Sequence, residues 1–161
     1  MICSRLVVIA YGNPLRGDDG LGWHAAEQLK KTSASSDVEI LQEQQLVPEL
    51  ALPIARAKAV IFVDAAAPQA TRAHPGEIHI VEIGKEETLR ASESPFHHHF
   101  SPQSLLALAR QLYGARTRAF IATLHGEDFT PGERLSKPVE LAMHEFVGRI
   151  ENLILDLGNS G

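Results

Sequence analysis

The sequence is poor in the features that mark several classes of protein. Cys3 is the one cysteine among 161 residues, so no disulfide can form within the chain. Asp and Glu outnumber Lys and Arg by 20 to 15, and this acidic balance argues against non-specific nucleic-acid binding. No apolar run is long enough to span a bilayer. The first residues also lack the basic and apolar regions of a signal peptide. We therefore expect a cytoplasmic protein that binds neither nucleic acid nor membranes.

Short motifs of several common enzyme classes are also missing. The glycine-rich run at 12–22 begins like a phosphate-binding loop, but Asp18 and Asp19 stand where such a loop has Lys and Ser or Thr. Two acids at that point would repel a phosphate. The spacing of Gly17, Gly20 and Gly22 is not that of a dinucleotide-binding fingerprint. The chain has no Gly-x-Ser-x-Gly motif of serine hydrolases and no His-Glu-x-x-His motif of zinc proteases.

What the sequence does have is an alternation of strand and helix patterns. The composition, 44% hydrophobic and 22% charged, is that of an ordinary globular domain. We predict strands at 6–10, 37–42, 59–63, 77–83 and 118–124, with helices at 21–31, 48–57, 102–113 and from 137 onward. Such alternation favours a three-layer α/β/α sandwich with a mostly parallel sheet of about five strands. We expect one domain over residues 1–161, with a frayed tail from about residue 158.

Acidic and imidazole side chains follow three of the predicted strands. Asp18 and Asp19 come after the first strand, Asp64 ends the third, and histidines 97–99 follow the strand at 77–83. In parallel sheets, ligands bind outside the carboxyl ends of the strands, so these side chains can converge on one edge. Two carboxylates and an imidazole suit a divalent metal and leave coordination positions open.

Simpler roles for the same side chains remain open at this point. Either acid of the pair, Asp18 or Asp19, can be a helix cap that also compensates the helix dipole. Asp64 can cap a loop, although a buried carboxylate usually needs a partner. A run of histidines in a polar loop is more often solvated than bound to a metal.

The pattern as a whole resembles the NiFe hydrogenase maturation endopeptidases. The run Gly-Asn-Pro-Leu-Arg-Gly-Asp-Asp-Gly-Leu-Gly at 12–22 is similar to the family's first motif. Phe-Val-Asp-Ala at 62–65 resembles the second, and Phe-His-His-His-Phe-Ser-Pro at 96–102 resembles the third. The segment at 126–136 is similar to the one before the family's last helix. The likeness extends over nearly the whole chain.

The resemblance implies a function and a set of site residues. Members of the family remove a C-terminal peptide from the hydrogenase large-subunit precursor once nickel has been inserted. Asp19, Asp64 and His98 would contact that nickel, with His99 as the alternative histidine, and Asp18 would be the helix cap. The metal is carried by the precursor, so the isolated protein would hold at most an adventitious divalent cation. The resemblance does not assign the general base.

Two departures from the family pattern leave other functions open. Ala10 stands where many members have glycine, and 44–50 lacks the Asp-Gly-Gly-Thr type of sequence that several members carry. The first alternative is a metal-sensing or chaperone module that binds the same precursor without cutting it. The second is a metallohydrolase of the same fold that holds its own metal.

Overall fold

The computed structural model describes residues 5–33, 37–67, 72–84 and 100–160. In this part of the chain, none of the helices is long and apolar enough to cross a membrane. The elements, in chain order, are β1 (Leu6–Tyr11), η1 (Gly17–Gly20), α1 (Leu21–Thr32), β2 (Val38–Glu43), η2 (Pro48–Leu50), α2 (Ala51–Ala55), β3 (Ala59–Ala66), β4 (Ile78–Ile83), α3 (Pro102–Tyr113), β5 (Arg118–His125) and α4 (Lys137–Asn159), where η denotes a 3-10 turn.

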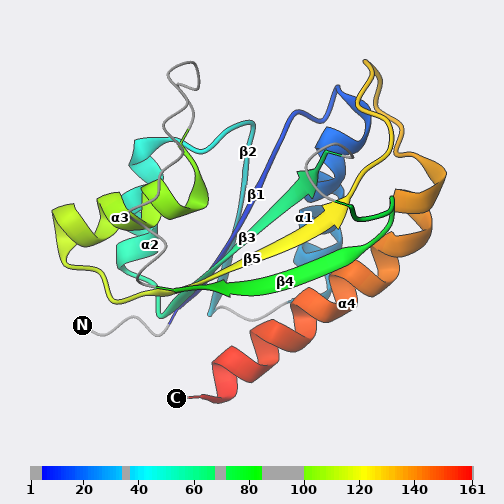
Figure 1. The fold of residues 1–161 in the computed structure, drawn as a ribbon. Helices are drawn as coiled ribbons and strands as arrows, with labels where there is room; N and C mark the ends of the chain where they lie inside the picture. The colour runs from blue at the N-terminus through cyan, green and yellow to red at the C-terminus, as the bar shows by residue number, and fades with distance from the viewer. Residues whose placement is uncertain (1–4, 34–36, 68–71, 85–99, 161) are drawn as a thin grey trace.

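The strands form one sheet in the order β2-β1-β3-β5-β4 (Figure 1). β1 pairs in parallel with β2 and β3, and β3 pairs in parallel with β5. Because β1 and β3 are central and covered on both faces, their sequences are apolar runs without alternation. β4 alternates because it is an edge strand, and it runs antiparallel to β5. The mostly parallel sheet of five strands is as predicted.

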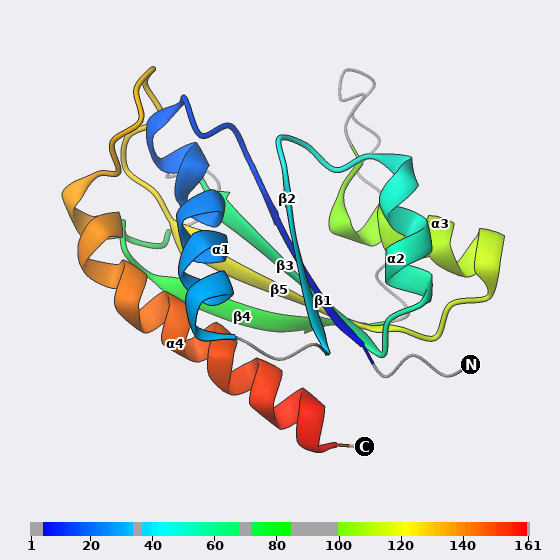
Figure 2. The ribbon, with the colours of Figure 1, turned by 180° about the vertical axis from the view of Figure 1, so that it is seen from behind.

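Helices cover both faces of the sheet, which confirms the three-layer α/β/α sandwich. α1 and α4 pack on one face, and α2 and α3 pack on the other (Figures 1 and 2). Alternate residues of each central strand belong to different cores: Val8 and Ile61 face α1 and α4, whereas Ile9 and Phe62 face α2 and α3. The position of a residue along a central strand therefore tells which pair of helices its side chain faces.

α3 begins and ends where the sequence predicts. The Ser101 hydroxyl accepts the backbone N–H of Ser104 at 3.1 Å, and the Ser101 N–H donates to the Ser104 hydroxyl at 2.8 Å. These two hydrogen bonds satisfy donors that a helix start leaves free. Gly114 ends the helix with φ of 64°, a left-handed conformation that suits glycine.

Two elements differ from the prediction. The helix expected at 48–57 is the 3-10 turn η2 followed by the five-residue α2. Pro53 does not interrupt α2 because it lies in the first turn, where backbone N–H groups have no partner within the helix. α4 continues to Asn159, so the helix extends past residue 158, where we expected fraying.

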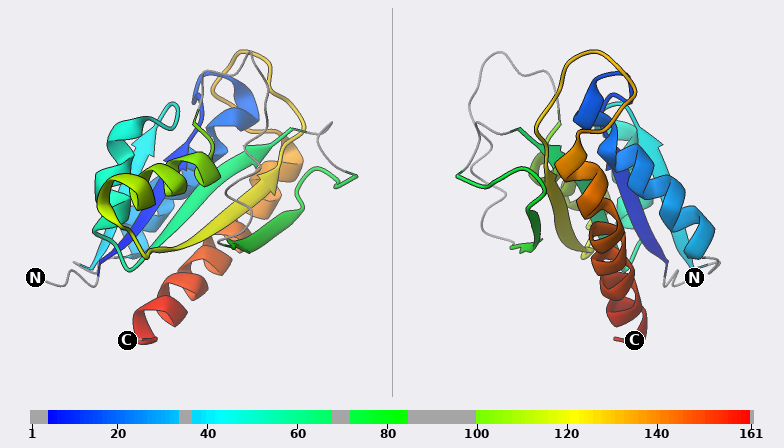
Figure 3. Two further views of the ribbon diagram at one scale, coloured as in Figure 1. Left: turned by 60° about the vertical axis from the view of Figure 1, so that its left-hand side comes forward. Right: turned by 90° about the vertical axis from the view of Figure 1, so that its right-hand side faces the viewer.

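The carboxyl ends of β1, β3 and β5 lie at one edge of the sheet. Figure 3 shows the blue connection from β1 to α1 beside the orange loop that precedes α4 at this edge. The candidate acids of the sequence belong to this end of the molecule.

Candidate functional site

Asp18 is fully buried and holds the loop at 126–136 against the connection between β1 and α1. Its carboxylate accepts the backbone N–H groups of Glu127, Asp128 and Ser136 at 2.8, 3.0 and 2.7 Å. It also accepts the Ser136 hydroxyl at 2.6 Å. Burial by itself raises the pKa of Asp18, but these donors outweigh burial and hold the pKa below its ordinary value. Asp18 is therefore a buried, charged anchor for this loop.

The prediction that Asp18 caps the first helix is wrong. The N-cap of α1 is Gly20, which has no side chain, and no side chain caps the helix start. Both oxygens of Asp18 are instead taken by donors from the loop more than a hundred residues further along the chain. Ser136 is the N-cap residue of α4, but its hydroxyl binds Asp18 and makes no capping hydrogen bond to α4.

The glycines of this turn allow close approach of the backbone. Gly12 has φ of 140°, and a Cβ there would lie 2.1 Å from the carbonyl oxygen of Asp19. Gly17 has φ of 55°, and a Cβ there would lie 2.4 Å from the carbonyl oxygen of Asp128. Side chains at these two positions would force the turn and the loop apart. The glycine-rich run thus serves to fold the turn tightly onto its neighbours.

Asp19 has a different environment from Asp18. Its side chain is half-buried, and its Oδ2 accepts the backbone N–H of Asn13 at 2.8 Å. The Asp19 N–H donates to the carbonyl of Arg16 at 3.1 Å. The turn therefore fixes the Asp19 carboxylate while leaving part of it open to solvent.

Asp64 lies on β3, directly after the residue that pairs with Ala10 of β1. Its Oδ1 accepts the N–H of Ala65 at 2.7 Å. Burial raises the pKa of Asp64 to about 7, and the negative charge of Asp19 adds to the rise, whereas the donors Tyr11 and Ala65 oppose it. The charge of Asp19 is the smallest of these influences, after burial and the two donors, and it places the two acids near each other at this edge.

No cation neutralises this acid pair within the described residues. The ion pairs of that part of the chain join Arg5 to Glu39, Lys30 to Glu27, Arg118 to Glu82 and Arg149 to Glu145. Neither Asp19 nor Asp64 takes part in them. Two neighbouring acids without a basic partner are an environment that a bound cation would stabilise.

Tyr11 is a member of this group that we did not identify from the sequence. It is the last residue of β1, and its hydroxyl opposes the rise in the pKa of Asp64. Burial, followed by the charge of Asp64, raises the pKa of Tyr11 above its ordinary value. Because Ala10 pairs with Val63, the next residues of the two strands lie on the same face of the sheet. Tyr11 could therefore be identified as a neighbour of Asp64 from the sequence only if the pairing of β1 with β3 were already known.

The histidines predicted as ligands, His98 and its alternative His99, lie outside the described residues. Within the described ranges, no three His, Cys, Asp or Glu side chains gather closely enough to hold a metal ion. One other histidine is buried near this edge: His125, at the end of β5, whose ring meets His79 edge-on at 5.1 Å. Its Nδ1 has no hydrogen-bond partner among the residues that the structure describes, and burial, together with His79, lowers its pKa.

Three solved structures have this architecture over nearly their whole length. The hydrogenase 2 maturation peptidase of a Thaumarchaeota archaeon aligns with a TM-score of 0.69 and 22% identity, covering 93% of this chain and 97% of its own. The hydrogenase maturating endopeptidase HybD of E. coli gives 0.68 and 23%, with 98% and 94% covered. The NiFe hydrogenase maturation protease HycI of Thermococcus kodakarensis KOD1 gives 0.68 and 24%, with 97% and 93% covered.

The chain has the fold of the hydrogenase maturation proteases. This agrees with the resemblance carried by the motif at 12–22. No protein-family model and no curated protein matches the chain. At identities of 22–24%, the likeness to solved structures establishes the fold.

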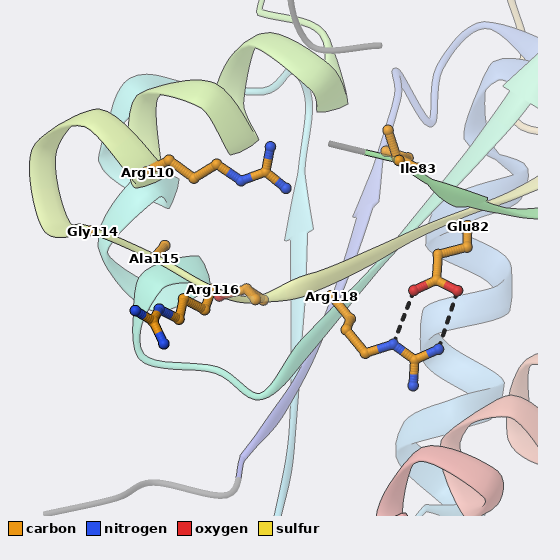
Figure 4. A pocket seen from close by; sticks show the side chains of 9 residues that line it. Glu82, Ile83, Arg110, Gly114, Ala115, Arg116 and Arg118 are labelled. Carbon is orange, nitrogen blue, oxygen red and sulfur yellow. Dashed lines mark hydrogen bonds and ion pairs between the residues drawn. The ribbon is translucent and has the colours of Figure 1, made fainter. Parts of the chain in front are cut away.

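A cavity of about 750 Å³ lies between the end of α3, β4 and the start of β5 (Figure 4). Its lining includes Arg110 and Arg116 and the ion pair of Arg118 with Glu82, whose N···O distances are 2.9 and 3.1 Å. Arg118 begins β5, whereas Asp64 pairs with Thr123 near the other end of that strand. The cavity is therefore separate from the carboxyl edge and from the candidate site.

Proposed function

We propose that this chain is an endopeptidase that removes the C-terminal extension of a NiFe hydrogenase large-subunit precursor after nickel insertion. The observation that carries the proposal is the acid pair of Asp19 and Asp64, which has no cationic partner in the described part of the chain. It lies at the ligand-binding edge of a fold whose solved members include named hydrogenase maturation proteases.

In this proposal Asp19, Asp64 and His98 contact the nickel that the precursor carries, with His99 as the alternative histidine. Carboxylate oxygens and a neutral imidazole are suitable ligands for nickel. A cation between the two acids would offset the repulsion that helps to raise the pKa of Asp64. The metal belongs to the substrate, and the isolated protein would bind at most an adventitious divalent cation.

The proposed reaction is hydrolysis of one peptide bond close to the bound nickel. Asp19 and Asp64 hold the metal, and through it the scissile carbonyl, at the edge of the sheet. The oxygen of a water adds to the carbonyl carbon, and its proton passes to a base, either a carboxylate or a metal-activated water. The carbon–nitrogen bond then breaks, and the departing amine takes up a proton. We place this reaction in the cytoplasm, as the sequence predicts.

The test is processing of nickel-loaded precursor by Asp19→Asn and Asp64→Asn variants. We expect each variant to lose at least about 100-fold in cleavage rate, because one anionic ligand of the metal is removed. Mass spectrometry of the precursor gives the rate and the cleavage site. Asp156→Asn, on the exposed face of α4, is the matched control and should cut normally. Full activity in both site variants would refute the assignment.

Experiments with the same precursor and the purified protein distinguish the two alternative functions from the proposed one. A metal-sensing or chaperone module would bind the precursor and leave it uncut. A self-sufficient metallohydrolase would retain stoichiometric metal through purification, which elemental analysis measures. We expect cleavage of the precursor and no stoichiometric metal.

A further inference from the structure

Leu15 is a large apolar side chain at the rim of the candidate site, and it remains 59% exposed. The other exposed large apolar side chains of the described residues lie on α2, α3, α4 and β4: Leu52, Val81, Leu112, Tyr113, Leu141 and Leu155. Leu15 differs from them because it is in the turn that carries Asp19.

The backbone at Leu15 is held on both sides. Its N–H donates to the Asn13 side-chain oxygen at 2.9 Å, and its carbonyl accepts the N–H of Gly132 at 2.8 Å. Arg16 forms a parallel bridge with Gly132, and Gly17 donates to the carbonyl of Gly132 at 2.8 Å. The leucine is thus presented to solvent from a fixed backbone, and binding through it loses little chain entropy.

The turn and the loop form a joint surface, residues 13–17 and 127–134, which we call the rim. The buried Asp18 holds the loop part of the rim, residues 127–134, through the hydrogen bonds described above. The exposed residues of the rim include charged side chains of both signs, Arg16, Glu127, Asp128, Glu133 and Arg134, and also the uncharged Thr130 and Pro131. An exposed apolar side chain in a surface of polar and charged residues fits the usual plan of a protein interface, which has an apolar centre and a polar periphery.

The position of Asp19 brings a protein substrate close to the rim. A metal ligand must come within about 2 Å of the ion. Asp19 is in the same closed turn as Leu15, because its carboxylate binds the N–H of Asn13 and its own N–H binds the carbonyl of Arg16. A protein that brings its metal to Asp19 therefore comes close to this turn.

We propose that Leu15 is the apolar anchor of the surface that docks the protein substrate, and that the substrate offers it an apolar pocket beside its metal. This inference rests on the proposed function, because that function supplies a folded protein partner. Residues 127–134 contact the same partner at the side of Leu15. The contact determines how tightly the substrate binds and does not take part in bond cleavage.

The test compares Leu15→Ala and Leu15→Asp with Leu155→Ala and Leu155→Asp. Leu155 is 62% exposed on α4 and supplies the same chemical change on a different face. For Leu15→Ala we expect KM for nickel-loaded precursor to rise about tenfold with kcat within about twofold of wild type, because an apolar contact is lost. Leu15→Asp should raise KM further. The Leu155 variants should leave both constants unchanged, and all four proteins should keep the wild-type Tm.

Direct binding of the nickel-loaded precursor, by biolayer interferometry, separates failure of this inference from failure of the proposed function. If the wild type binds but does not cut, the proposed function fails, and weaker binding by the Leu15 variants alone still supports the docking surface. Equal binding by Leu15 and Leu155 variants overturns the inference. A fall in kcat at unchanged KM also overturns it. A wild type that neither cuts nor binds the precursor overturns both.

Discussion

Asp18 and Asp64 are carboxylates at the same edge of one sheet, yet their surroundings shift their pKa values in opposite directions. Asp18 is buried among four donors from the loop at 126–136, and its pKa is lowered. Asp64 is half-buried near the negative charge of Asp19, and its pKa is raised to about 7. Burial acts on both groups in the same sense, so the number of donors decides the outcome. One acid contributes to the stability of the fold, whereas the other is held in a costly state that a cation would relieve.

Removing the anchor should produce the largest change in stability. Asp18→Asn puts an amide N–H₂ among donors that need an acceptor, and we expect a loss of about 3 kcal/mol in the free energy of unfolding. Urea denaturation measures the loss. Asp19→Asn is the adjacent control, and it should stay within about 1 kcal/mol of wild type because Asp19 is half-exposed and accepts one hydrogen bond. Equal losses in the two variants would remove the distinction between the acids.

The pH dependence of stability should separate Asp18 from Asp64. The folded-state pKa of Asp64 lies above its ordinary value of 3.8, so between about pH 4 and 7 the folded state binds more protons than the unfolded state. The contribution of Asp64 to stability therefore falls as pH rises through that window. We expect Asp64→Asn to raise Tm by a few degrees at pH 8 and to change it little at pH 4, as measured by calorimetry.

Asp18 gives the opposite sign and serves as the comparison for that experiment. Its folded-state pKa is below the ordinary value, so its stabilisation is present above about pH 4 and is lost as pH falls through the lowered pKa. The penalty of Asp18→Asn should therefore shrink in acid. If the two variants showed the same pH dependence, the assignment of opposite environments would be wrong.

A smaller effect is expected from Tyr11→Phe. Its hydroxyl is one of the donors that oppose the rise of the Asp64 pKa, so its loss should raise that pKa further. Carbon-13 NMR of the Asp carboxyl groups follows the titration. Tyr113→Phe is the natural control, since Tyr113 is the other tyrosine of the chain and is 52% exposed at the end of α3. No change in Asp64 with Tyr11→Phe would remove Tyr11 from the site.

The sequence predicts the fold well because local signals and tertiary structure agree. Unalternating apolar runs specify the central strands β1 and β3, alternation specifies the edge strand β4, and Ser101 and Gly114 mark the ends of α3. The placement of Asp19 and Asp64 at one edge follows from the parallel topology alone. Their role as metal ligands stays a prediction, as does that of His98, which lies outside the described residues.

The interactions that the sequence did not reveal are long-range. The donors to Asp18 come from 109 to 118 residues further along the chain, so no local pattern indicates them. A carboxylate before a helix favours the cap interpretation, and tertiary hydrogen bonds override it. Tyr11 follows an apolar strand and looks like part of the core until the register of β1 and β3 is known. The sequence also does not indicate that His125 is buried beside His79 of β4, with an Nδ1 that has no partner among the described residues.

Because Asp18 anchors a loop that lies far along the chain, the candidate site cannot form until that loop has been synthesised. The turn that holds Asp19 is synthesised early. Its contacts with the loop form only after residues 127–136 have left the ribosome and β5 has joined the sheet. Contacts of such long sequence separation form slowly and late in folding. A nascent chain that still lacks residues 127–136 therefore carries both acids without the contacts that fix the turn of Asp19, and the site assembles only after that loop has been made.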